Sequence, residues 1–194
     1  MEIDFAEIRA YLRHIEDLSL PAFAAIPEDG LYMEQVLVFV NESLNFLEKD
    51  ERLTSFMVNN YVKGKMIPAP EKKKYGKEQI GYLLALTLLK ETLSIPDIGT
   101  LIDLESGVSS SKERLYKFWA KMEERLYRQG AISLMRQIDG VEQRYKKEAE
   151  ENVVFASDNA KDAIGYLALR LAVQAQVDKA LSEFLIKQIQ KQSK

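Results

Sequence analysis

Apolar residues recur at helical spacing along most of this chain, and the exceptions mark the ends of the predicted helices. A first helix is predicted over residues 4–17, opened by the capping-box pair Asp4 and Glu7. Its apolar face holds Phe5, Ile8, Leu12 and Ile15. Residues 19–30 contain two prolines and an Asp-Gly pair, which favour an extended connector. The apolar side chains expected to anchor this connector are Leu20, Phe23 and Ile26.

The pattern of residues 31–75 predicts two helices followed by an exposed turn. The first helix covers residues 31–49 and turns its apolar side chains inward: Met33, Val36, Leu37, Val40, Leu44 and Leu47. Thr54-Ser55 is an N-cap signal for a short helix over residues 56–65. Pro68 and Pro70 lack a backbone donor, so we expect the chain to leave the helix before them. Residues 71–75 then form a turn, either alone or as the tip of a short two-stranded wing.

The rest of the chain is predicted to be helical. One helix begins near Gly76 or Lys77, and Ser94 with Asp97 caps another that ends between residues 103 and 106. Further helices are predicted over residues 110–129, 132–150 and 157–190, with a stop at Gly130 and a break at residues 139–140.

Two apolar stripes in this C-terminal part are interpreted structurally. The first is expected in the core and holds Leu115, Phe118, Trp119, Met122 and Leu126. The second is wider than one partner helix needs, so it predicts a buried central helix or a subunit contact. Its residues are Ala160, Ala163, Ile164, Leu167, Ala168, Leu171 and Leu181.

Composition favours a cytoplasmic protein. The chain has 194 residues, of which 46% are hydrophobic, and it contains no cysteine, which favours a reducing compartment. Its first residues are acidic and do not form a signal peptide. The densest apolar stretches, residues 83–89 and 163–173, are shorter than the roughly 20 residues that cross a bilayer. We therefore expect no contact with a membrane.

Charge is distributed unevenly. The net charge is −3, but residues 1–51 carry 3 basic and 12 acidic side chains, whereas residues 52–94 carry 8 basic and 3 acidic ones. Residues 95–194 are nearly balanced, with 16 basic and 15 acidic side chains. Binding to a phosphate backbone needs a local positive field rather than a positive total. Residues 52–94 provide such a field.

The order of elements in this basic segment is typical of a winged helix-turn-helix. In that motif the second helix enters the major groove, so it must be short, well capped and polar on its outer side. The helical periodicity of residues 56–65 predicts that four side chains face inward: Met57, Val58, Tyr61 and Val62. The polar residues left to face a groove are Ser55, Asn59, Asn60 and Lys63. Asparagine can bind adenine edges, and lysines 72–74 are placed for phosphates or an adjacent minor groove.

The segment Met57-Val58-Asn59-Asn60-Tyr61-Val62-Lys63-Gly64-Lys65-Met66-Ile67-Pro68 resembles the MerR family. There the recognition helix ends in tyrosine, glycine, two apolar residues and proline. Residues 74–80 and 93–102 resemble the following MerR elements, and the string over residues 20–105 is closer still to domain of unknown function 1836, itself MerR-like. MerR proteins have arginine and tyrosine where Asn59 and Asn60 stand, and their glycine falls at Lys65.

The resemblance implies a dimer that binds double-stranded DNA, with Asn59, Asn60, Tyr61 and Lys63 at the groove and Lys74 and Tyr75 at the wing. Together with the pattern, it predicts an all-α fold with a minor β wing. Residues 1–30 form a helix and connector, residues 31–106 the winged helix-turn-helix, and residues 107–194 a helical region for dimerisation or effector binding. The candidate DNA-binding residues are Thr54, Ser55, Asn59, Asn60, Tyr61, Lys63, Lys72, Lys73, Lys74 and Tyr75.

Catalytic chemistry is not indicated. His14 is the only histidine, and one imidazole near Asp17 makes neither a metal site nor a triad. The chain has no Gly-rich phosphate loop and no Ser/His/Asp set. We therefore expect no enzyme activity, no metal and no cofactor, and we expect a homodimer that regulates transcription through sequence-specific DNA binding. The alternative is a non-catalytic interaction or scaffold module that keeps the fold without binding DNA, which the acidic first 51 residues favour.

Overall fold

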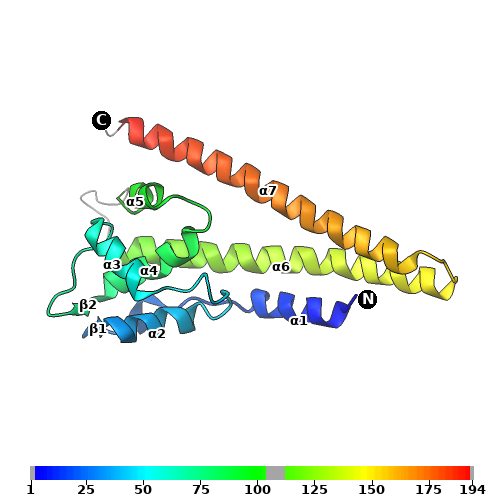
Figure 1. Ribbon diagram of the computed structural model, residues 1–194, viewed down its shortest axis with the longest axis horizontal. Helices are drawn as coiled ribbons and strands as arrows, with labels where there is room; N and C mark the ends of the chain where they lie inside the picture. The colour runs from blue at the N-terminus through cyan, green and yellow to red at the C-terminus, as the bar shows by residue number, and fades with distance from the viewer. Residues whose placement is uncertain (1–2, 104–111, 193–194) are drawn as a thin grey trace. The chain divides into compact units, whose positions relative to one another are not determined.

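The computed structural model describes residues 3–103 and 112–192, which are mostly helical apart from one small sheet (Figure 1). The described residues form two compact units. Unit 1 contains residues 3–19 and 123–180, and unit 2 contains residues 20–103, 112–122 and 181–192. Helices α6 (Lys112–Glu150) and α7 (Ala156–Gln192) contribute residues to both units. Among the described helices, none is long and apolar enough to cross a membrane.

Unit 1 is built on helix α1, which spans Phe5–Glu16. The carboxylate of Asp4 accepts hydrogen bonds from the backbone N–H groups of Ala6 and Glu7, both at 2.9 Å, so the predicted N-cap is confirmed. The predicted apolar face is confirmed too, since Phe5, Leu12 and Ile15 are buried. Two of these side chains form a core with residues of the long helices, and its buried members are Phe5, Leu12, Ile138 and Ala160.

Helix α6 is continuous where the sequence predicted an interruption. The predicted stop at Gly130 and the break at Asp139-Gly140 are both wrong, because one helix spans Lys112–Glu150. A glycine inside a helix costs only about 1 kcal/mol relative to alanine. Ala131 and Ile138, which are 4% and 3% exposed, pack into unit 1 and outweigh this cost. The predicted final helix is confirmed as α7. Residues 104–111, where one predicted helix ends and the helix predicted over residues 110–129 begins, lie outside the described residues.

Helix α7 is not the buried central helix that one interpretation of its apolar band predicted. Every described residue from 168 to 181 is exposed, and Leu171 and Leu181 of that band are 44% and 58% exposed. Helical periodicity alone shows which side chains share a face. It does not show how many sides of a helix its neighbours cover. The buried interpretation is therefore wrong, and the subunit contact stays a prediction.

Unit 2 opens with the connector, which ends in a two-stranded sheet. Its predicted anchors are confirmed, since Leu20, Phe23 and Ile26 are 7%, 9% and 1% exposed, and Phe23–Ala25 forms the short 3₁₀ helix η1. Strand β1 (Leu31–Tyr32) pairs antiparallel with β2 (Lys74–Tyr75), so that Leu31 lies opposite Tyr75.

Helix α2 is shorter than predicted at both ends. It spans Met33–Ser43 instead of residues 31–49. At its start, Gly30 has a φ of 70° and turns the chain into β1, which uses residues 31 and 32 for the sheet. At its end, Leu44 leaves the helical region with φ −116° and ψ 42°. The connection to the next helix therefore covers residues 44–54 and is not the short turn expected of a helix-turn-helix.

Three further helices complete unit 2, and their predicted caps are confirmed. Helix α3 spans Ser55–Lys63, α4 spans Lys77–Leu89 and α5 spans Ile95–Asp103. Ser94 Oγ accepts a hydrogen bond from the N–H of Asp97 at 3.3 Å and donates to its carboxylate at 2.7 Å. Trp119 of α6 is buried as predicted, whereas Phe118 and Leu126 of the same stripe are 65% and 54% exposed, so their assignment to the core is wrong. The fully buried centre of unit 2 includes Val36, Val40, Val58, Ile80, Leu83, Leu84 and Ile98.

Candidate nucleic-acid interface

Helix α3 presents a polar face to solvent and an apolar face to the core of unit 2. Val58 and Tyr61 are 0% and 6% exposed, so they fix the inward side of the helix. The outward side carries the predicted polar residues, all of them exposed: Ser55, Asn59, Asn60 and Lys63. The division into two faces that periodicity predicted is therefore confirmed.

The start of α3 is held by two sets of hydrogen bonds. Thr54 Oγ1 accepts from the backbone N–H of Met57 at 3.3 Å, as expected of an N-cap. The side-chain amide of Asn41, on α2, binds both backbone groups of Leu53: its Nδ2 donates to the carbonyl at 3.0 Å, and its Oδ1 accepts from the N–H at 2.9 Å. Asn41 thereby fixes the residue before the cap and couples the position of α3 to that of α2.

The end of α3 is closed by a Schellman motif. The N–H of Met66 donates to the carbonyl of Tyr61 at 2.9 Å, and the N–H of Lys65 donates to the carbonyl of Val62 at 3.0 Å. The residue that must be left-handed in this motif is Lys65, with a φ of 60°. Glycine usually fills that position, because a Cβ atom raises the energy of a left-handed backbone. The adjacent Gly64 keeps a negative φ of −77°.

Lysines 72 and 73 occupy the tip of a tight turn. The N–H of Lys74 donates to the carbonyl of Glu71 at 2.8 Å, and both residues between them have positive φ angles, 47° for Lys72 and 67° for Lys73. This is the conformation of a type I′ turn, in which Asn-Gly is strongly preferred. A left-handed backbone at a lysine costs roughly 1–2 kcal/mol, and the turn has two such lysines.

The third lysine of the turn differs from the other two. Lys72 and Lys73 are exposed, whereas Lys74 is half-buried and its Nζ lies 5.3 Å from the ring centroid of Tyr32. The predicted turn is present, with an isolated antiparallel bridge between Glu71 and Lys74 across it, but the strand that follows it, β2, pairs with β1 in the small sheet. In Figure 1 the loop that joins α3 to β2 extends outward beside α3.

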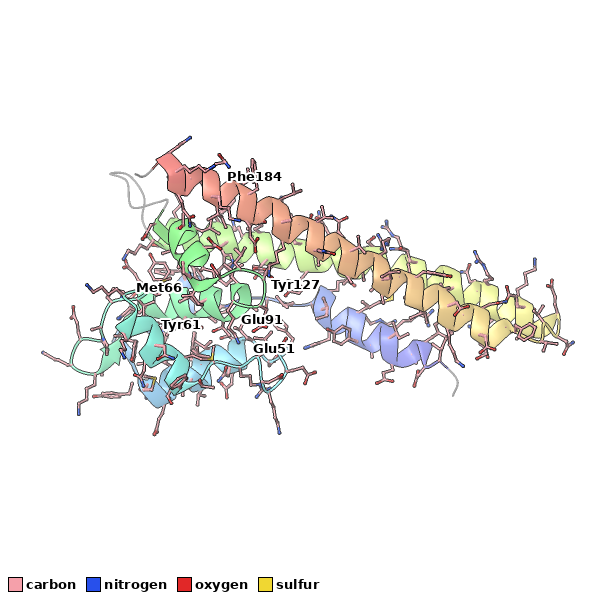
Figure 2. The ribbon with its side chains drawn as sticks, turned by 45° about the horizontal axis from the view of Figure 1, so that its top comes forward. Glu51, Tyr61, Met66, Glu91, Tyr127 and Phe184 are labelled. Atoms are coloured by element: carbon pink, nitrogen blue, oxygen red, sulfur yellow. The ribbon has the colours of Figure 1, made fainter. Side chains whose placement is uncertain are left out.

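Two of the predicted contact residues lie in the core. Tyr61 and Tyr75 are 6% and 3% exposed, so their side chains are not on the outward face. Burial raises the pKa of both phenols, and the nearby carboxylate of Glu91 raises that of Tyr61 further (Figure 2). The family resemblance implied that Tyr61 lies at the groove and Tyr75 at the wing, but the structure buries both side chains. The remaining predicted residues are accessible: Thr54, Ser55, Asn59, Asn60, Lys63, Lys72 and Lys73 are exposed, and Lys74 is half-buried.

Acidic side chains offset part of the positive charge near the turn. Glu28 forms an ion pair with Lys77 at 2.6 Å, and the hydrogen bond from Lys77 lowers the pKa of the Glu28 carboxyl. Glu28 and Asp29 line a hollow of about 550 Å³ together with Lys72 and Lys74. The connector therefore places carboxylates beside the turn, while the side chains of Lys72 and Lys73 stay exposed.

Sequence analysis missed one large residue on the exposed face. Phe56 is 73% exposed, and it stands three and four residues before Asn59 and Asn60. This is the spacing of one helix face, so the periodicity that selected the asparagines would also have selected Phe56. An exposed aromatic ring at that position can contact a thymine methyl group in a major groove.

Residues 21–129 match the family described as domain of unknown function (DUF1836). The chain belongs to this family. The match covers the whole of η1, the sheet and helices α2 to α5, together with the part of α6 that packs in unit 2. No curated protein and no solved structure matches the chain.

Proposed function

We propose that this DUF1836 protein is a non-catalytic, sequence-specific DNA-binding regulator of transcription. Its binding surface is the outward face of α3 together with the exposed lysines of the β2 turn. These belong to a MerR-like winged helix-turn-helix over residues 31–106, in which residues 44–54 replace the usual short turn. The observation that carries the proposal is a firmly capped short helix whose exposed polar side chains are amides, a hydroxyl and a cation, beside the exposed ring of Phe56. Such groups bond to base edges and phosphates in a major groove.

The backbone of the turn gives independent support. Lysines 72 and 73 stand in left-handed conformations that favour asparagine and glycine, so their side chains are retained against a cost in stability. Phosphate binding is a physical reason for retaining two ammonium groups there. Lys65 supports the MerR likeness in the same way, because the left-handed residue at the end of α3 stands where MerR proteins have glycine.

Helix α7 supports assembly as a homodimer. Tyr166, Leu169, Val173 and Val177 recur at helical spacing, and each is between 47% and 71% exposed. A contiguous apolar stripe on a long helix is rarely left in water. A second copy pairing through this stripe would supply two recognition helices for a two-fold symmetric DNA site.

The proposal is tested by selection from a random-sequence duplex library with the full chain at low salt. We expect enrichment of a two-fold symmetric sequence that contains adenines. Asn59→Ala or Asn60→Ala should relax the preference at one base position per half-site, by ~1–3 kcal/mol for a lost bidentate contact. A library that returns without enrichment contradicts the proposal.

The second candidate is a protein-interaction or scaffold module that has kept the fold and does not bind DNA. The exposed ring of Phe56 and the carboxylate of Glu28 beside the turn favour it, since DNA is repelled by carboxylates and a protein partner is not. The variant Glu28→Gln separates the two. It strengthens binding to a duplex if the α3 surface binds DNA, and it has no such effect if the module binds only protein.

A further inference from the structure

Unit 1 contains an open groove that the DNA-binding proposal does not use. Helices α1, α6 and α7 all contribute to it, and its volume is about 620 Å³. This volume is in the range of ~300–1,000 Å³ typical of small-molecule sites. Its lining residues lie within residues 11–15 of α1, 123–134 of α6 and 171–178 of α7.

The floor of the groove is apolar and open at Gly130. The side chains of Leu12, Ile15 and Ala131 are buried there, at 5%, 9% and 4% exposure. Gly130 is exposed, and a Cβ atom built on it would have no neighbouring atom within 4 Å. A glycine in a helix is not required by the backbone, so its effect at this position is to leave room over α6.

The charged groups of the groove are all of one sign. Of the lining residues, Glu123 and Asp178 are the acidic ones, and no lysine, arginine or histidine lines it. Asp178 also accepts a hydrogen bond from the side chain of Gln174 at 2.9 Å, which fixes its carboxylate on α7. Two aromatic rings, Tyr11 and Tyr127, face the same space (Tyr127 is labelled in Figure 2). Carboxylates and phenol rings both attract cations, and an apolar floor favours a ligand with apolar surface.

We propose that this groove binds an organic cation with a large apolar body, such as a quaternary ammonium or phosphonium compound. The apolar body lies over Gly130 and Ala131, and the positive charge lies between the carboxylates of Glu123 and Asp178. The α7 residues of the groove, Leu171, Ala175 and Asp178, are not those of the exposed stripe.

Isothermal titration of the full chain with two ions of similar size and opposite charge tests this. The probes are tetraphenylphosphonium and tetraphenylborate. We expect saturable binding of the cation and binding of the anion weaker by about tenfold or more, because two carboxylates favour one charge and repel the other. Equal affinity for both ions, or no saturable binding of the cation, overturns the proposal.

Matched variants locate the bound cation. Gly130→Leu fills the groove and should weaken binding by about tenfold or more, while it raises helix propensity. Gly140→Leu is the control, since Gly140 is also an exposed glycine of α6 with nothing within 4 Å of its Cβ position, and it does not line the groove. The double variant Glu123→Gln/Asp178→Asn should abolish the preference for the cation. Unchanged binding by Gly130→Leu, or an unchanged preference in the double variant, shows that the cation binds elsewhere.

Discussion

Replacing Lys72 and Lys73 by Asn and Gly should stabilise the fold and weaken DNA binding at the same time. The two lysines have φ angles of 47° and 67°, and a left-handed backbone costs a non-glycine residue roughly 1–2 kcal/mol. Asn-Gly is the preferred pair for this type I′ turn. Because asparagine recovers only part of the cost, we expect the double variant to gain about 1–2 kcal/mol in the free energy of unfolding.

The effect on DNA follows from the two ammonium groups lost. Each phosphate contact contributes about 0.9 to the slope of log K against log salt, so two lysines contribute ~1.8 per subunit. Lys74 is left out of this number because its ammonium group lies over the ring of Tyr32. Fluorescence anisotropy with a labelled duplex, between about 50 and 200 mM salt, measures the slope.

A matched control removes two adjacent lysines elsewhere. Lys146→Gln/Lys147→Gln, on α6, takes away the same charge and should leave the slope unchanged. The phosphate-binding role of the turn is refuted if the Lys72→Asn/Lys73→Gly variant keeps the wild-type slope. The backbone argument is refuted if urea unfolding shows a loss of stability in that variant.

Four other predictions concern single residues. Lys65→Gly should stabilise the chain by up to ~1 kcal/mol in urea unfolding, because glycine removes the strain of a left-handed Cβ position; a loss would contradict the Schellman assignment. Asn41→Ala should destabilise it by about 2 kcal/mol, since two backbone groups lose their partner; a change near zero would mean that water replaces the amide. Val173→Asp should convert a dimer to a folded monomer in sedimentation equilibrium, and an unchanged mass would exclude the α7 stripe as the interface. Arg9 donates a hydrogen bond to Glu142 and lowers its pKa, so this carboxylate stabilises unit 1 above its ordinary pKa and loses that contribution as pH falls through the folded value. Glu142→Gln should therefore flatten the acid side of the stability–pH curve, and an unchanged curve would count against the ion pair.

Local signals predicted the parts of the fold that depend on local interactions. The caps at Asp4, Thr54 and Ser94 were predictable because a cap needs only a short polar side chain and the next two or three backbone N–H groups. The two faces of α3 followed from periodicity in the same way. Phe56 shares the outward face with Asn59 and belonged in that prediction.

Interactions between distant segments determined what the sequence did not predict. The start of α2 was wrong because residues 31 and 32 pair with β2, which lies more than forty residues later. Gly130 was taken for a helix end because nothing local distinguishes a glycine that ends a helix from one that lies over open space. The family resemblance placed Tyr61 at the groove, whereas packing in unit 2 buries its ring.

The central claim concerns which surface meets DNA, and hydrogen–deuterium exchange with and without a duplex tests it most directly. The measurement uses the full chain at low salt and compares peptides from all described helices. We expect slower exchange on DNA binding in residues 54–65 and 71–75, with little change in the peptides of α1. Protection confined to other segments, under conditions where the duplex is bound, would contradict the account.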